Sequence, residues 1–191
     1  MATDALPVPL PSVPPGLTAE PADAVDAFLR LSAALTGFDR MELLGTGMVP
    51  RYYDELTRII GAREVGTLLA AAGRVESDHP ASGEDFDRAF REQILDDNRF
   101  GPVARRVVTM WYIGSWAQLP REWRNTYGAT SLDVDHVVSA AAYREGLAWV
   151  AAGAHPMGAK QQGFGAWARP SRLRPGTGAA TGTATGVEAD R

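Results

Sequence analysis

His155 is the residue of this sequence whose surroundings most favour proton transfer, because imidazole changes its charge near neutral pH. Gly153 is expected to end a helix just before it and Pro156 follows it, so His155 occupies a constrained loop, where functional groups often lie. Glu145, on the preceding predicted helix, could form an acid and base pair with His155. Nothing in the spacing brings the two together, and a histidine that bonds a helix-end carbonyl is the commoner arrangement. We therefore favour a structural role over catalysis and expect no catalytic residue in this chain.

His136 follows two carboxylates in the segment Asp133 to His136, a composition that resembles a set of metal ligands. Neighbouring side chains diverge on any regular element, so these three are not expected to converge on one ion. The sequence has no cysteine, which excludes thiolate metal sites, cysteine nucleophiles and disulfides. We expect no metal site in this chain.

Two glycine-containing segments lack the residues that phosphate binding requires. The stretch from Gly45 to Pro50 has neither the lysine of a phosphate loop nor a preceding strand, and the same holds for Gly163 and Gly165. The net charge of -4 and the absence of any run of Lys or Arg argue against nucleic-acid binding. We expect neither a cofactor nor a nucleic acid to bind this chain.

Large aromatic side chains set the second half of the chain apart. All five tryptophans fall there, and they are Trp111, Trp116, Trp123, Trp149 and Trp167. Aromatic residues are enriched in cores and at the centres of protein interfaces, so many anchors with little chemistry indicate a protein that binds another protein. We expect Trp111 and Trp149 in the core. The predicted partner-binding residues are Trp116, His155, Phe164, Trp167 and Pro170.

The elements that must position these side chains are mostly helical, because the apolar residues repeat with helical spacing. The prediction is an all-α fold, a compact bundle of about five to six helices with an irregular aromatic C-terminal arm. Three regions are expected: a disordered proline-rich lead at residues 1–19, a helical domain at 20–172, and a disordered Gly/Thr/Ala tail at 173–191. No apolar run reaches the roughly 20 residues that a membrane span needs, and no export signal is visible at the N-terminus.

Glycines, prolines and capping residues predict where the helices end. Helices are expected over residues 21–36, 50–60, 82–97 and 102–115. Gly73 is expected to end a further helix, and residues 119–131 are expected to form a loop. Ser139 is expected to cap a single helix over residues 140–152.

Four short blocks carry a family resemblance. They are FLRLSAALTG at 28–37, MWYIG at 110–114, VVSAAAY at 137–143 and GFGAWARP at 163–170. In order and rough spacing they resemble the small subunit of bacterial membrane-associated, FAD-dependent sugar and polyol dehydrogenases, such as the sorbitol, fructose, glucose and gluconate dehydrogenases.

The resemblance implies a non-catalytic accessory subunit that binds and stabilises a large GMC-type flavoprotein, which holds the FAD and oxidises the sugar. In that family a cytochrome c subunit often takes the electrons, and the small subunit commonly helps to export the large one. The resemblance thus implies a periplasmic or membrane-associated location, whereas the lack of a visible signal favours the cytoplasm. Two other functions stay open: a free-standing helical interaction module, and a small enzyme that uses His155.

Overall fold

The computed structural model describes residues 21–79 and 83–156. The predicted lead and tail lie outside these residues, as do the predicted arm residues Phe164, Trp167 and Pro170. In chain order the elements are α1 (Pro21–Thr36), α2 (Arg40–Gly45), α3 (Val49–Ile60), α4 (Ala62–Asp78), α5 (Glu84–Phe90), the π-helical turn η1 (Arg91–Leu95), α6 (Phe100–Ile113), β1 (Ser115–Trp116), α7 (Arg121–Tyr127), β2 (His136–Val137), α8 (Ala140–Arg144) and α9 (Leu147–Ala151). The all-α prediction is confirmed, with one short antiparallel strand pair added to it.

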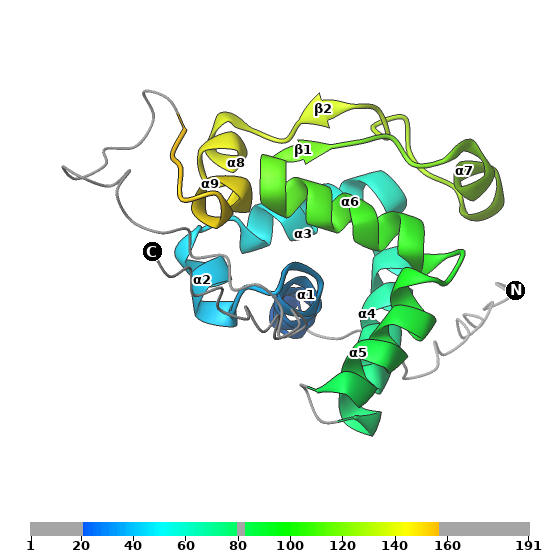
Figure 1. Cartoon of the computed structure of the whole chain (residues 1–191). Helices are drawn as coiled ribbons and strands as arrows, with labels where there is room; N and C mark the ends of the chain where they lie inside the picture. The colour runs from blue at the N-terminus through cyan, green and yellow to red at the C-terminus, as the bar shows by residue number, and fades with distance from the viewer. Residues whose placement is uncertain (1–20, 80–82, 157–191) are drawn as a thin grey trace, which may run out of the picture.

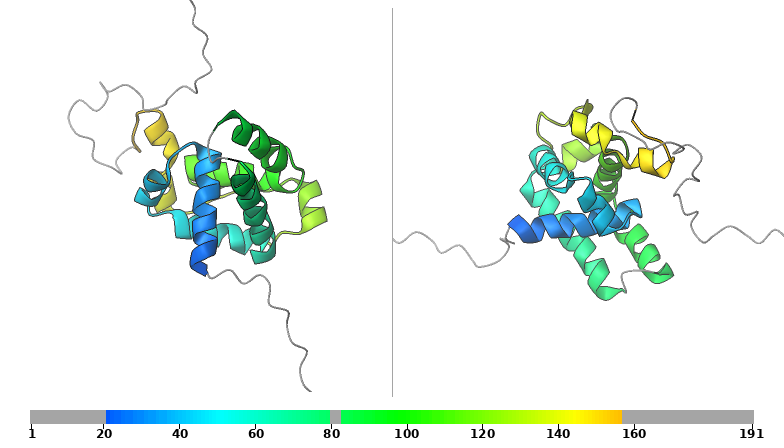
Figure 2. Two further views of the ribbon diagram at one scale, coloured as in Figure 1. Left: turned by 90° about the horizontal axis from the view of Figure 1, so that it is seen from below. Right: turned by 90° about the vertical axis from the view of Figure 1, so that its left-hand side faces the viewer.

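Helix α6 lies at the centre of the fold, where α1, η1, β1 and α9 all pack against it (Figure 1). Helices α4 and α5 pack on each other and extend to one side of α6 (Figure 2). The strands β1 and β2 pair with Ser115 opposite Val137 and form a ribbon, with α7 near one end and α8 and α9 near the other. The ribbon therefore lies between α7 at one end and helices α8 and α9 at the other.

Helix α3 shows how the apolar spacing produces a buried face. Tyr52, Leu56 and Ile59 recur at helical intervals, and each is fully buried. Pro50 lies in the first turn, where its missing N–H costs nothing, and Gly61 ends the helix with a positive φ of 85°. The predicted helix over 50–60 is thus confirmed to within a residue.

Helix α4 does not end at Gly73, contrary to the prediction, but continues to Asp78. A glycine inside a helix costs only about 1 kcal/mol relative to alanine. Val75, two residues after Gly73, is fully buried, and burying a valine contributes about 1.5–3 kcal/mol. Tertiary burial therefore outweighs the local propensity of Gly73.

Residues 119–131 were predicted to form a loop, and this is wrong because α7 occupies Arg121–Tyr127. Trp123 is buried, and its indole N–H donates to the Arg99 carbonyl oxygen at 2.7 Å. The Arg99 guanidinium lies 5.4 Å from the centre of the Tyr127 ring, within reach of a cation–π interaction. These long-range contacts hold a short helix that local sequence alone does not support.

The single helix predicted over 140–152 is instead two short helices, α8 and α9. Ser139 caps α8 as predicted, since its side chain accepts from the Ala142 N–H at 3.0 Å. The break falls at Gly146, where a Cβ would lie 2.7 Å from the carbonyl oxygen of Tyr112 on α6. The chain turns there because its backbone passes this close to α6.

The centre of the core is aromatic. Trp111 is fully buried as predicted, and its ring meets the ring of Tyr52 edge to face, with centroids 4.8 Å apart. Such pairs contribute about 0.5–1.5 kcal/mol beyond the burial of their area. None of the helices in the described ranges is long and apolar enough to cross a lipid bilayer.

Candidate functional site

The candidate site lies where the C-terminal end of α6 meets α8, α9 and the residues that follow them. Gly114 ends α6 in the left-handed conformation, at a φ of 69°. A Cβ on Gly114 would lie 2.5 Å from the carbonyl carbon of Ala142, so the end of α6 rests directly on the backbone of α8. Gly114 and Gly146 together bring the side chains of the three helices onto one face.

An apolar groove of about 300 Å³ crosses this face. Its lining, which defines the apolar groove from here on, is Tyr112, Ile113, Tyr143, Ala148, Trp149, Ala152 and Ala154. The rings of Tyr143 and Trp149 meet edge to face with centroids 5.5 Å apart, and the Trp149 indole N–H donates to the Tyr143 carbonyl oxygen at 2.9 Å. The groove therefore has a rigid aromatic wall.

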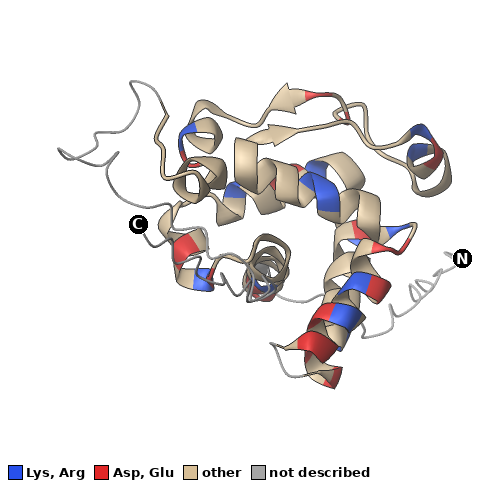
Figure 3. Ribbon diagram, viewed as in Figure 1, with Lys and Arg blue, Asp and Glu red and all other residues tan. Residues whose placement is uncertain are grey.

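Large apolar side chains at the groove are open to solvent. Ile113 is 54% exposed and Tyr143 is 46% exposed, and both line the groove. Figure 3 shows that the neighbouring end of α6 and the β-ribbon carry few charges, whereas α5 carries many. Apolar patches rimmed by polar residues on a monomer often mark binding sites.

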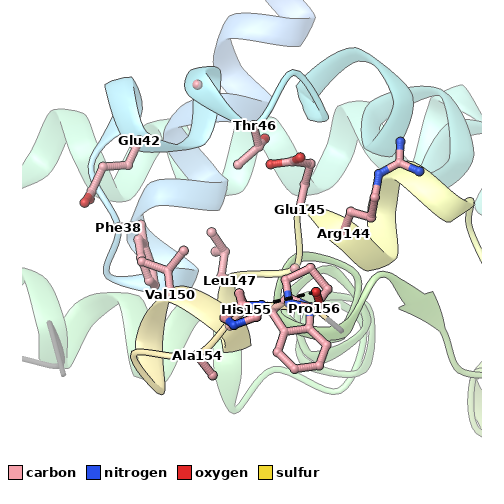
Figure 4. A pocket seen from close by; sticks show the side chains of 13 residues that line it. Phe38, Glu42, Thr46, Arg144, Glu145, Leu147, Val150, Ala154, His155 and Pro156 are labelled. Carbon is pink, nitrogen blue, oxygen red and sulfur yellow. Dashed lines mark hydrogen bonds between the residues drawn. The ribbon is translucent and has the colours of Figure 1, made fainter. Parts of the chain in front are cut away.

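A second cavity of about 350 Å³ lies next to the groove, and we call it the carboxylate pocket (Figure 4). Its lining is Phe38, Glu42, Gly45, Thr46, Arg144, Glu145, Gly146, Leu147, Trp149, Val150, Ala154, His155 and Pro156. Figure 4 shows the Glu145 carboxylate directed toward Thr46, with the Arg144 guanidinium directed away from it. The Glu42 carboxylate accepts from the Asp39 N–H at 3.0 Å as part of a helix capping box.

The structure brings His155 and Glu145 into the lining of one cavity, a convergence that the sequence spacing did not indicate. His155 is half-buried, and its Nδ1 lies 3.4 Å from the carbonyl oxygen of Pro156. Gly153, with a positive φ of 65°, follows α9 and turns the chain before His155, and the same pocket is lined by Glu42 and Thr46 from the region of α2.

The charge of Glu145 acts on the core as well as on the pocket. Burial of the Tyr52 hydroxyl raises its pKa far above the usual value, and the nearby Glu145 charge raises it further. The Tyr52 hydroxyl therefore stays protonated near pH 7.

Trp116 does not offer its indole to a partner, and the structure corrects that expectation. It is 1% exposed, and its indole N–H donates to the buried Asp133 carboxylate at 2.8 Å. Asp133 also accepts from the Leu119 N–H at 3.1 Å. Trp116 anchors the ribbon to the core because its one polar group finds a partner there.

Trp149, predicted as core, is only half-buried and forms part of the site.

The three adjacent side chains that resembled a metal site turn to different partners. Asp133 binds Trp116, Asp135 accepts from the Gln118 N–H at 2.6 Å, and His136 lies between two oxygens. The His136 Nδ1 is 2.7 Å from the Val134 carbonyl, and its Nε2 is 3.0 Å from the carboxylate of Glu55. Within residues 21–79 and 83–156, no three side chains of the usual ligand types are grouped to hold a metal ion.

Sequence reasoning did not select the exposed residues of this face. Ile113 is the last residue of α6 and lies exposed there. The sequence did contain a sign that Ile113 is exposed. Thr109 and Arg106 precede it by one and two helical turns, so they lie on the same side of the helix. An apolar residue on an otherwise polar stripe indicates a surface contact.

No family model, curated protein or solved structure matches this chain.

Proposed function

We propose that this chain is a non-catalytic accessory subunit that binds and stabilises a large FAD-containing sugar or polyol dehydrogenase subunit of the GMC type. The observation that carries the proposal is the exposed apolar face around Ile113, Tyr143 and Trp149. A partner that covers this face removes apolar surface from water, which contributes about 25 cal/mol for each Å².

The family resemblance supports the choice of partner. Two of its four blocks, MWYIG and VVSAAAY, end at this face, since they contain Ile113 and Tyr143. The fourth block, GFGAWARP, follows Pro156 in the chain, and Pro156 lines the carboxylate pocket. We place the FAD and the sugar chemistry on the partner, and in this proposal a cytochrome c subunit can join the complex.

A partner that binds only the folded flavoprotein also stabilises it by mass action. A free concentration of small subunit one hundred times its Kd would add about 2.7 kcal/mol to the stability of the flavoprotein. A rise in the melting temperature of the flavoprotein on addition of this chain is thus a direct expectation of the proposal.

Co-expression tests the proposal most simply. The partner to co-express is a GMC-type flavoprotein, taken from an adjacent reading frame where one encodes it, and the measurement is co-purification through a tag on this chain. The Ile113→Asp variant is expected to bind about 30-fold more weakly, because truncating or charging a central apolar anchor costs about 2 kcal/mol.

The matched control is Val134→Asp, because Val134 is also β-branched and 50% exposed but lies in the bend before β2 and does not line the groove. The double variant Phe164→Ala with Trp167→Ala tests the predicted arm in the same assay. Equal binding by the Ile113 and Val134 variants would remove this face from the proposal. Stoichiometric flavin on the purified chain alone would contradict the accessory role.

A second candidate function is a small acid–base enzyme, favoured by the shared cavity of Glu145 and His155. It requires that both side chains contribute to turnover by the isolated chain. If a substrate is found, Glu145→Gln and His155→Gln should each lower kcat while leaving flavoprotein binding unchanged. The opposite pattern would support the accessory role alone.

A further inference from the structure

The chain leaves α9 at the rim of the apolar groove. Helix α9 ends at Ala151, and Ala152 and Ala154, which follow it, both line the groove. Residues 157–191 continue the chain beyond Pro156. A segment that follows Pro156 closely is therefore held near the groove by its covalent connection.

The groove offers an apolar surface on which the hydrogen-bond donors of the wall are already engaged. The Trp149 indole N–H donates to the Tyr143 carbonyl oxygen at 2.9 Å, and the Tyr112 hydroxyl donates to the Thr36 carbonyl oxygen at 3.0 Å. An apolar side chain without a donor of its own therefore fits the groove better than a polar one. At about 300 Å³ the groove has room for an aromatic ring, since an apolar cavity of about 150 Å³ already holds benzene.

The sequence supplies such a ring a short way along the chain. Phe164 follows Ala154 by ten residues and lies between Gly163 and Gly165. The two glycines have no side chains, so the backbone on either side of Phe164 can approach a surface closely. Phenylalanine has no polar atom in its side chain, whereas the indole N–H of Trp167 needs an acceptor wherever it is buried. Phe164 is therefore the aromatic residue of this segment that best matches the groove.

The length of the connection favours binding within one molecule over binding between molecules. A connection of ten residues spans at most about 35 Å when extended, so Phe164 cannot move far from the rim at Ala154. A ring tethered in this way has an effective concentration in the millimolar range at the groove. A contact that a free peptide makes only at such concentrations is therefore well populated within the chain.

We propose that in the isolated chain the apolar groove binds the chain's own residues 163–170, with the Phe164 ring seated against Trp149 and Ile113. One surface then contains three of the sequence blocks, at 110–114, 137–143 and 163–170. The inference goes beyond the proposed function and does not depend on it, because the contact forms without a flavoprotein.

Competition by a free peptide tests the inference on the full-length chain. The probe is a capped peptide with the sequence of residues 163–170, and its control peptide has alanine in place of the phenylalanine. The readout is the indole N–H resonance of Trp149 in the nitrogen-15-labelled chain, assigned with a Trp149→Phe variant. In the Phe164→Ala chain the segment no longer competes, so the probe should shift this resonance saturably and the control peptide should not.

The wild-type chain should bind the probe about tenfold more weakly than the Phe164→Ala chain, because its own segment competes at a millimolar effective concentration. Trp167→Ala is the matched chain variant, expected to keep the weak binding of the wild type. Circular dichroism of both variants verifies that the helices remain. Equal affinities of the wild type and Phe164→Ala would leave the groove to a segment of another protein and overturn the inference, as would the lack of a saturable shift in Phe164→Ala.

Dilution distinguishes the chain's own segment from that of a second copy. The Trp149 resonance of the wild type should not depend on chain concentration. A shift toward the Phe164→Ala position on dilution would assign the ring to a second copy and contradict the proposal. Probe binding by Trp167→Ala as tight as by Phe164→Ala would assign the contact to Trp167, which also contradicts it.

The outcome is separable from that of the proposed function. The expected peptide affinities without flavoprotein co-purification contradict the proposed function alone. Co-purification together with equal peptide affinities of the wild type and Phe164→Ala contradicts this inference alone.

Discussion

Gly114 and Ala142 lie in backbone contact, so that a Cβ on Gly114 would sit 2.5 Å from the Ala142 carbonyl carbon. This contact joins the end of α6 to α8 and sets the position of the apolar groove. The same glycine has a φ of 69°, a conformation that residues with a side chain rarely adopt. Both the local turn and the tertiary contact therefore require glycine.

We predict that Gly114→Ala lowers the free energy of unfolding by at least about 2 kcal/mol, because the left-handed strain of about 1 kcal/mol adds to a clash with a backbone that has little room to move. Urea unfolding measures the loss. The control is Gly47→Ala, where φ is 68° but a Cβ would meet nothing within 4 Å. Equal losses in the two variants would show that the contact with Ala142 is unimportant.

We predict that Asp133→Asn destabilises the protein by about 2–3 kcal/mol. The buried carboxylate accepts from Trp116 and Leu119, and hydrogen bonds to charged groups contribute about 1.5–3 kcal/mol. Asp135→Asn is the matched control, because that exposed carboxylate accepts only from the Gln118 N–H in the described structure and should lose under about 1 kcal/mol. Chemical denaturation measures the free energy of unfolding of both variants. A larger loss in Asp135→Asn than in Asp133→Asn would contradict the prediction.

We predict that stability falls above about pH 10 partly through Tyr52. Burial first, and the Glu145 charge second, raise the pKa of Tyr52 in the folded state. Below the usual tyrosine pKa of about 10 both states are neutral, and above it only the unfolded state ionises, so folding loses stability as the pH rises. Tyr52→Phe should flatten this alkaline decline in thermal melts across pH 9 to 11. An unchanged slope in Tyr52→Phe would exclude the mechanism.

We predict that Arg99→Lys loosens α7. The Arg99 guanidinium donates to both Glu64 carboxylate oxygens at 2.9 Å and lies over the Tyr127 ring, and lysine cannot reproduce this fork. The expected cost is about 1–2 kcal/mol, with faster amide hydrogen exchange at residues 121–127. Arg88→Lys changes an exposed pair with Asp85 and should cost under about 0.5 kcal/mol. Unchanged exchange over 121–127 would count against the anchoring role of Arg99.

Apolar periodicity and turn residues were enough to predict the all-α class and the main helices. Apolar residues at helical spacing, together with Pro50, Gly61 and Pro102, predicted α3 and α6 to within about two residues, and the size and position of Trp111 predicted its burial. Each of these features depends on residues within one element, and a periodic pattern reports which face of that element is buried.

The candidate site, in contrast, depends on contacts between elements that are separate in the sequence. The break at Gly146 depends on the Tyr112 carbonyl, the burial of Trp116 depends on Asp133, and α7 depends on Arg99. The physical reason is that each of these partners lies on another element, so no local spacing encodes the contact. The meeting of Glu145 and His155 in one pocket follows from the same close backbone packing, which forms only when α6, α8 and α9 assemble.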